Sequence, residues 1–277
     1  MPATPVNIAV TVFEVVLLLL GVILLARLVL SRSARAAARG NQALAPWSVS
    51  VSDFLLFAFL MVAGGLFSAF LSGLILARFS LPPDTKTILN SAVFQLGLLI
   101  GPAVLPLNLS HRPLVPPFLS NVFRSGAATF LIALPIVSLV NLAWQALLDL
   151  CGLPAEQQDL LRMFSQATEP ALIGVMIVLA TVIAPITEEL LFRATLFRYL
   201  RTRVPRWIAL LVPGVVFAAL HVNWSNLDGL ASFLPLVTLA AVFSLAFERT
   251  GRIGTAMVAH GLFNLHTIML VLLGVTT

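Results

Sequence analysis

The chain has 277 residues, of which 60% are hydrophobic and only 10% are charged, and its formal net charge is +5 at pH 7. Soluble globular proteins are about 45–50% apolar and about 25% charged, so this composition excludes a soluble enzyme, a disordered chain and a fibrous repeat. It is typical of a polytopic membrane protein, in which each spanning helix needs about 20 apolar residues. We therefore expect an all-α membrane bundle of about eight transmembrane helices, with residues 1–277 forming a single membrane domain.

Eight apolar runs are candidates for these helices. Helix-stopping residues such as Leu81-Pro82-Pro83 and Thr250-Gly251 separate them. The first run is too long for a signal-peptide core, so we expect it to remain as a helix. In chain order the runs are Ile8–Leu30, Phe54–Phe79, Ile88–Leu107, Ser125–Leu148, Ala171–Tyr199, Trp207–His221, Ala231–Phe247 and Ile253–Val275.

Lysine and arginine are distributed unevenly among the connections between these runs. The first, third, fifth and seventh connections hold twelve of them, whereas the second, fourth and sixth hold three. Because positively charged loops stay on the cytoplasmic side, this asymmetry predicts an integral membrane protein with both termini outside. The alanine-rich and arginine-rich sequence with short loops indicates a prokaryotic cell membrane.

Ionisable residues inside apolar runs are energetically expensive, so each of them needs a reason. The segment Glu188-Glu189-Leu190-Leu191-Phe192-Arg193 holds three of them. Glu189 and Arg193 are four residues apart, share a helical face and can form an ion pair. Glu188 is turned about 100° from Glu189 on an α-helix, so it points elsewhere and stays free to act. The alternative is an ion-pair cluster that only fixes helix packing.

Two later runs carry further polar groups. Phe217-Ala218-Ala219-Leu220-His221 ends the sixth run, and His260 shares a helical face with Asn264 on the last one. From the spacing of these residues to the neighbouring cytoplasmic turns, we expect Glu188, His221 and His260 to lie at similar depth. The alternatives are an interfacial histidine bonded to a carbonyl group and polar contacts that hold helices together. Other polar residues within the runs, for which the sequence indicates no catalytic role, are Glu14, Gln95, Asn141, Gln145 and His266.

These groups match the needs of peptide-bond hydrolysis, which requires an activated water and stabilisation of the developing oxyanion. A glutamate can act as the general base, and a histidine can hold and orient the same water. A second histidine and an asparagine supply hydrogen-bond donors to the carbonyl oxygen. Glu188, His221, His260 and Asn264 together provide this set.

Three segments resemble, in order, the EExxxR, FxxxH and HxxxN motifs of the type II CAAX prenyl endopeptidases, also called the CPBP family of CAAX proteases and bacteriocin-processing enzymes. They are EELLFR at 188–193, FAALH at 217–221 and HGLFN at 260–264. The resemblance covers about Ala171–Leu270. It implies variable N-terminal helices over residues 1–170 and a CPBP-like catalytic core over residues 171–270.

The resemblance implies an intramembrane endopeptidase that hydrolyses a peptide bond of a membrane-associated substrate. It implies that Glu188 activates the water together with His221, and that His260 and Asn264 stabilise the oxyanion. Glu189 and Arg193 would support them. The alternatives are a catalytically silent scaffold or a bacteriocin self-immunity protein of the same family, and a proton-coupled transporter.

The resemblance also bears on cofactors and partners. A glutamate and two histidines can in principle bind zinc, since catalytic zinc sites have three protein ligands and a water. The family was long labelled metalloendopeptidase, but we favour a glutamate-dependent reaction without a metal or other cofactor. The expected partners are the lipid bilayer and a membrane-associated peptide or protein, lipidated in the eukaryotic members, whereas no nucleic acid is expected.

Overall fold

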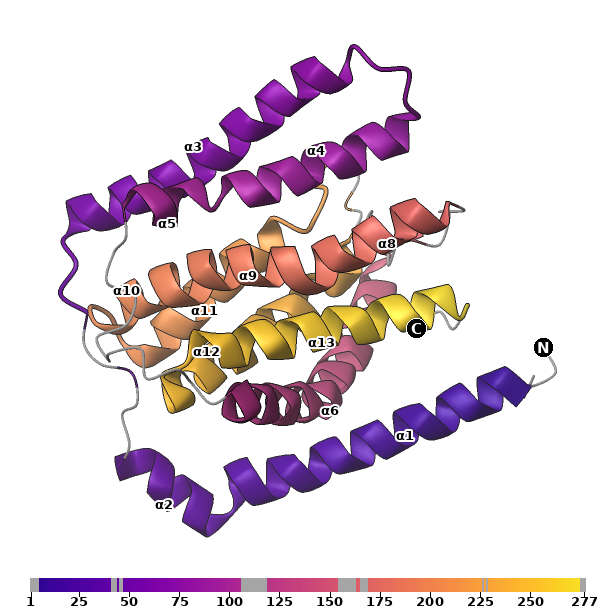
Figure 1. Ribbon diagram of the computed structural model, residues 1–277. Coiled ribbons are helices and arrows are strands. Elements are labelled where there is room, and N and C mark those ends of the chain that lie inside the picture. Colours follow the sequence, from indigo (N-terminus) through magenta and orange to yellow (C-terminus); the bar gives the residue numbers. More distant parts are fainter. Residues whose placement is uncertain are drawn as a thin grey trace.

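The computed structural model describes residues 5–40, 44, 47–105, 119–153, 163–164, 169–225, 227 and 229–274. The regular elements in these ranges are helices that lie side by side as a bundle (Figure 1). The predicted all-α bundle is therefore confirmed. The predicted third and fourth connections fall largely outside the described residues.

The helices form a central group flanked on two sides. On one side lie α1 (Pro5–Leu25), the π-helical η1 (Ala26–Leu30) and α2 (Arg32–Gly40). On the other side lies α3 (Val51–Leu76), and the chain then runs back beside it as α4 (Pro83–Gly97) and α5 (Ile100–Val104) (Figure 1). The central group consists of α6 (Leu119–Cys151), the segments of the fifth span, α11 (Arg206–Ala219), η4 (Leu230–Ser232), α12 (Phe233–Thr250) and α13 (Ile253–Leu272). The beginning of α1 and the end of α13 lie at the same end of the bundle (Figure 1).

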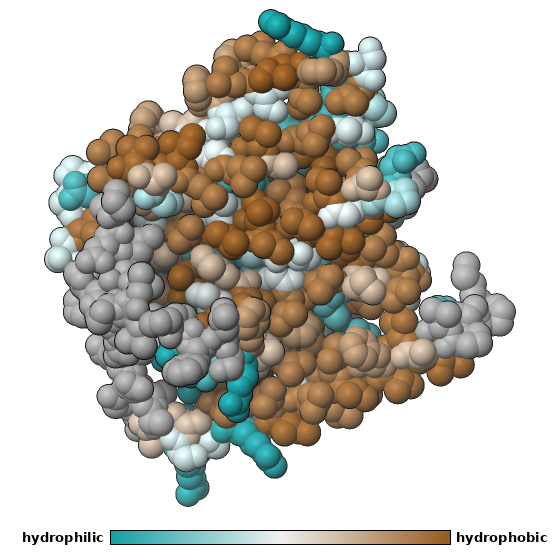
Figure 2. All heavy atoms as spheres, viewed as in Figure 1, coloured by the Kyte–Doolittle hydropathy of each residue, from teal (hydrophilic) through white to brown (hydrophobic). Residues whose placement is uncertain are grey.

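Seven helical stretches in the described part of the chain are long and apolar enough to cross a membrane. Apolar side chains cover most of the visible face of the molecule (Figure 2), as expected for a surface that contacts lipid. The stretches are Asn7–Leu30, Val51–Leu76, Pro83–Val104, Asn121–Cys151, Pro170–Arg201, Leu230–Thr250 and Ile253–Leu272.

The predicted crossing Trp207–His221 is shorter than the sequence indicated. It forms α11, whose 14 residues extend about 21 Å, less than the roughly 30 Å of a hydrocarbon core. The indole of Trp224 donates a hydrogen bond to the Ala219 carbonyl (2.9 Å) and so satisfies a backbone acceptor at the end of the helix. The described residues 220–225, 227 and 229 are not helical, so His221 lies directly beyond the last helical turn.

The fifth span changes its helical pitch along its length. It runs through α8 (Pro170–Val178), η2 (Leu179–Ile183), α9 (Ala184–Glu189), η3 (Leu190–Phe197) and α10 (Arg198–Arg201), and η2 and η3 are π-helical. A π-helical turn contains more residues than an α-helical turn, so it re-aims the side chains that follow, and such turns are common at functional sites. The two glutamates of α9 lie between the two π-helical segments.

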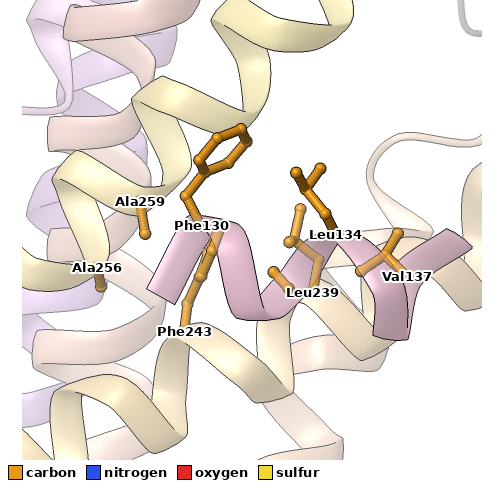
Figure 3. Close-up of a cluster of buried hydrophobic side chains, with 8 residues drawn as sticks. Phe130, Leu134, Val137, Leu239, Phe243, Ala256 and Ala259 are labelled. Atoms are coloured by element: carbon orange, nitrogen blue, oxygen red, sulfur yellow. The ribbon is translucent and has the colours of Figure 1, made fainter. Parts of the chain in front are cut away.

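A buried apolar cluster holds α6, α12 and α13 together in the centre of the bundle (Figure 3). Two alanines of α13 are fully buried in it, and such small side chains let helices approach closely in a membrane. This cluster fixes α13, which carries His260, against its neighbours. Its members are Phe130, Ala133, Leu134, Val137, Leu239, Phe243, Ala256 and Ala259.

The first span packs along α6, and its Leu17 and Leu18 contact the central cluster, although only 6% of its most apolar window is buried. The two backbones approach closely at Gly21, where an added Cβ would lie 2.1 Å from the Leu131 carbonyl oxygen. A polar contact joins the span to α13: Glu14 Oε1 lies 2.8 Å from His266 Nε2. Glu14 and His266, to which the sequence assigned no catalytic role, thus pair with each other.

Gly261 sets the distance between α13 and the fifth span. A Cβ at this position would lie 2.4 Å from the carbonyl oxygen of Thr181 in η2. We predict that Gly261→Ala lowers the free energy of unfolding by about 1–3 kcal/mol, because the added methyl group forces the two backbones apart. Thermal unfolding of the purified protein in detergent measures the change.

Gly174→Ala is the matched control for this substitution. It lies in the same fifth span, and a Cβ there would meet no atom within 4 Å. Its unfolding temperature should equal or exceed that of the wild type, since alanine stabilises a helix relative to glycine. Equal unfolding temperatures for the two variants would contradict the close packing of α13 on η2.

Candidate active site

The site is built around a buried ion pair in the fifth span. Arg193 Nη1 lies 2.9 Å from Glu189 Oε1, and both side chains are almost completely buried. This confirms the pair that the four-residue spacing predicted. The guanidinium carbon lies 5.0 Å and 5.6 Å from the ring centroids of Phe217 and Phe243. The two aromatic faces replace water around the cation.

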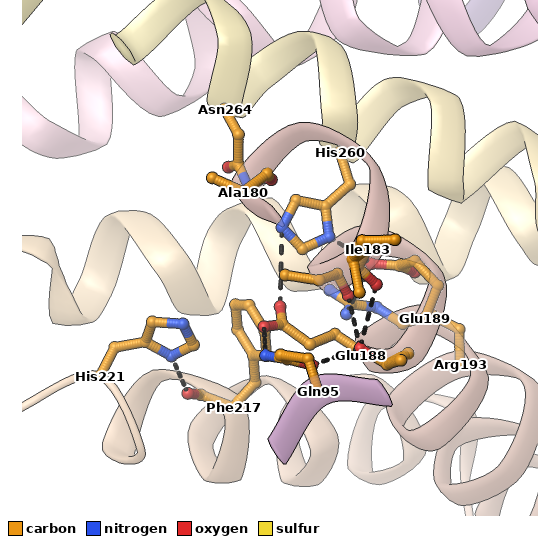
Figure 4. A network of polar contacts seen from close by, with 12 residues as sticks. Gln95, Ala180, Ile183, Glu188, Glu189, Arg193, Phe217, His221, His260 and Asn264 are labelled. Carbon is orange, nitrogen blue, oxygen red and sulfur yellow. Dashed lines mark hydrogen bonds and ion pairs between the residues drawn. The ribbon is translucent and has the colours of Figure 1, made fainter. Parts of the chain in front are cut away.

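His260 of α13 contacts the same carboxylate. Its Nδ1 lies 2.9 Å from Glu189 Oε1, the oxygen that also contacts Arg193. A carboxylate oxygen only accepts hydrogen bonds, so Nδ1 carries a proton. In a neutral imidazole Nε2 is then an acceptor, and it lies 3.8 Å from Glu188 Oε2 (Figure 4). Glu189 thus fixes the tautomer and the direction of the His260 ring.

Glu188 points away from its neighbour Glu189, as the 100° rotation between them predicted. Its Oε1 accepts a hydrogen bond from Gln95 Nε2 of α4 (3.4 Å). Gln95 is itself oriented by Thr187, whose hydroxyl donates to the Gln95 Oε1. Sequence reasoning missed Gln95 as a site residue, although its polar amide inside an apolar run was a signal.

Glu188 and His260 form a pair that can exchange a proton. The Glu188 side chain is 17% exposed and that of His260 is 4% exposed, so little solvent separates them. A carboxylate oxygen and an unprotonated Nε2 are both acceptors and repel each other. A proton added to Nε2 would remove this repulsion, and a carboxylate beside an imidazole is a combination used in general acid–base chemistry.

His221 lies beside this pair without contacting Glu188 in the described part of the chain. Its Nδ1 donates to the Phe217 carbonyl (2.7 Å), which leaves Nε2 as an acceptor. The Phe217 ring centroid lies 4.5 Å from that of His221 and 6.0 Å from that of His260. Phe217 therefore contacts both imidazoles, and Figure 4 shows His221 apart from the Glu188 carboxylate.

Asn264 is engaged with the backbone of the fifth span. Its Nδ2 donates to the carbonyl oxygen of Ala180 in η2 (2.8 Å). A primary amide has two N–H donors, so one of them stays available. The structure thus brings Glu188, Glu189, Arg193 and His260 into direct contact, whereas it holds His221 and Asn264 nearby through backbone carbonyls.

The donor set does not fit a zinc centre. Within the ranges that the structure describes, no three His, Cys, Asp or Glu side chains are grouped so as to hold a metal ion. Catalytic zinc sites need three protein ligands. His260 Nδ1 is already bonded to Glu189, and His221 lies apart from both. A reaction without a metal stays a prediction.

Part of the chain, including the candidate site, is similar to known proteins. Residues 170–266 match the family model described as type II CAAX prenyl endopeptidase Rce1-like. A stretch of 94 residues is 28% identical to the UPF0177 protein YbdI of Lactococcus lactis subsp. lactis (strain IL1403), over 33% of this chain and 46% of that protein. No solved structure matches the chain.

The family match contains all three motifs on which the resemblance was based. Glu188, His221 and His260 lie within the matched residues, so the expected resemblance to this family is confirmed over residues 170–266. The match spans less than half of the length of YbdI. Over residues 170–266 the chain is thus similar to the type II CAAX prenyl endopeptidase Rce1-like family, a family of proteases.

Proposed function

We propose that the protein is an intramembrane endopeptidase that cleaves a membrane-associated peptide or protein near the cytoplasmic face. One observation carries the proposal: Glu188 Oε2 lies 3.8 Å from His260 Nε2 in a segment that matches a protease family. A partly exposed carboxylate beside a buried imidazole suits the activation of water. The substrate carries a hydrocarbon group or an apolar segment, since the site lies within a bundle of apolar helices.

In the proposed reaction Glu188 accepts a proton from water while the water oxygen bonds to the carbonyl carbon of the substrate. His221 Nε2 accepts a hydrogen bond from the same water, and its Nδ1 is already used by Phe217. Protonated His260 and the second N–H of Asn264 stabilise the oxyanion. The proton then passes from Glu188 to the amide nitrogen, the C–N bond breaks, and a carboxylic acid and an amine leave.

The proposed orientation puts both termini outside a prokaryotic cell membrane. The beginning of α1 and the end of α13 lie at one end of the bundle (Figure 1). At the other end lies an arginine-rich turn, in which Arg201 and Arg206 contact Glu248 at 2.6 Å and 2.7 Å. Positively charged loops stay in the cytoplasm, so this end faces inward.

We predict that Glu188→Gln lowers the cleavage rate at least about 100-fold, because an amide cannot act as the general base. The full chain is reconstituted in liposomes and tested with two fluorogenic probes. One is a farnesylated peptide with a C-terminal CaaX sequence, and the other is an unmodified apolar membrane peptide.

Glu14→Gln is the matched control, since Glu14 also lies within a span but pairs with His266 outside the site. It should cleave at the wild-type rate. A Glu188→Gln variant as active as the wild type would contradict the proposed base. Failure of the wild type to cleave either probe would favour a catalytically silent scaffold.

Gln95 positions Glu188, and its loss should affect turnover. We predict that Gln95→Leu lowers kcat about ten-fold with little change in KM, because a hydrogen bond to the reacting carboxylate is lost. Gln145→Leu is the control: Gln145 donates to Asn141 (3.3 Å) within α6 and away from the site. An equal loss of activity in both variants would show a general effect of removing an intramembrane amide.

Metal dependence is tested separately. We predict that the reconstituted protein keeps its cleavage rate after incubation with a membrane-permeant chelator and dialysis, because the site lacks three grouped ligands in the described residues. The same preparation is analysed for bound zinc by elemental analysis. Loss of activity on chelation that zinc restores would overturn the prediction.

A further inference from the structure

An open hollow with a volume of about 580 Å³ lies at one end of the bundle, away from the candidate active site. It is formed between η1, the beginning of α6 and the turn that joins α12 to α13. Five of its seven lining residues are polar or cationic, and no acidic residue of the described ranges lines it. We call it the basic hollow, and the residues that matter for its chemistry are Leu28, Asn121, Arg124, Ser125, Thr250 and Arg252.

Among the described residues, no acidic side chain pairs with the two arginines of the basic hollow. Arg124 and Arg252 are exposed, and neither guanidinium forms a hydrogen bond or an ion pair with a described residue. By contrast, Arg201 and Arg206 are neutralised by Glu248. Two unpaired guanidinium groups that face one hollow attract an anion, and their planar donor arrays match the oxygens of a phosphate.

The basic hollow lies where spans end. The first candidate span ends at Leu30, the fourth begins at Asn121, the sixth ends at Thr250 and the seventh begins at Ile253. Span ends lie at the boundary between hydrocarbon and water. Leu28, which lines the hollow, is 47% exposed, and the span that contains it is almost unburied. An apolar surface therefore leads from the bilayer directly to the two arginines.

We propose that the basic hollow binds the headgroup phosphate of an anionic membrane lipid, with the acyl chains lying along α1. The charge, the position and the apolar approach all match such a lipid, and basic pockets between transmembrane helices on the cytoplasmic side bind anionic headgroups. Free phosphate shares the charge but gains nothing from the exposed apolar surface of α1. The inference is independent of the proposed peptidase activity.

Native mass spectrometry of the full chain in detergent tests this site. Phosphatidylglycerol and phosphatidylcholine are titrated into the wild type and into Arg124→Gln/Arg252→Gln. We expect phosphatidylglycerol to bind the double variant about 25-fold more weakly, or about five-fold for each arginine. Binding of phosphatidylcholine should be weak and equal in both proteins.

Arg32→Gln/Arg35→Gln is the matched control, because it removes the same charge from exposed positions on α2 that do not line the hollow. It should bind phosphatidylglycerol as the wild type does. Arg124→Lys/Arg252→Lys keeps the charge and should recover most of the binding, which separates charge loss from misfolding. Equally weakened binding of phosphatidylglycerol in the two double glutamine variants would contradict the proposed site. Displacement of the lipid by millimolar inorganic phosphate would overturn its assignment to a lipid.

Discussion

One buried cation organises the C-terminal half of the bundle. Arg193 can lie in the interior only because Glu189 neutralises it and the rings of Phe217 and Phe243 cover it. The same carboxylate also accepts from His260, so four elements of the bundle converge on one charge pair. A shift of any of them would leave a charge without its partner in a low-dielectric interior. The need to neutralise the buried charge of Arg193 therefore determines both how these helices pack and which way the His260 ring points.

Two adjacent glutamates have different surroundings because the helix turns their side chains in different directions. Glu189 is fully buried and contacts Arg193 and His260. Glu188 keeps some exposure and has a weaker set of contacts, with Gln95 and with His260 Nε2. His260 links them through its two nitrogens. In this arrangement the contacts of Glu189 fix its carboxylate, whereas the carboxylate of Glu188 stays accessible.

Local sequence patterns correctly predicted the features that are determined within a single helix. The all-α bundle, most of the spans and the Glu189–Arg193 pair follow from apolar run length and four-residue spacing. The contact of Gln95 with Glu188 does not, because 93 residues separate them and only tertiary packing brings α4 to the fifth span. The hydrogen bond from Trp224 at the early end of α11 also has no counterpart in the periodicity of the sequence. Pitch changes such as η2 and η3 also have no clear signature in sequence.

The shortness of α11 has a consequence for the surrounding bilayer. Trp207 at its start and Trp224 beyond its end are 63% and 59% exposed, and tryptophan favours the headgroup level of a membrane. A hydrophobic segment shorter than the hydrocarbon core draws the two leaflets together beside it. We therefore expect hydrophobic mismatch to thin the membrane next to the segment that carries His221. Water and an extended peptide would then cross less lipid to reach the proposed active site.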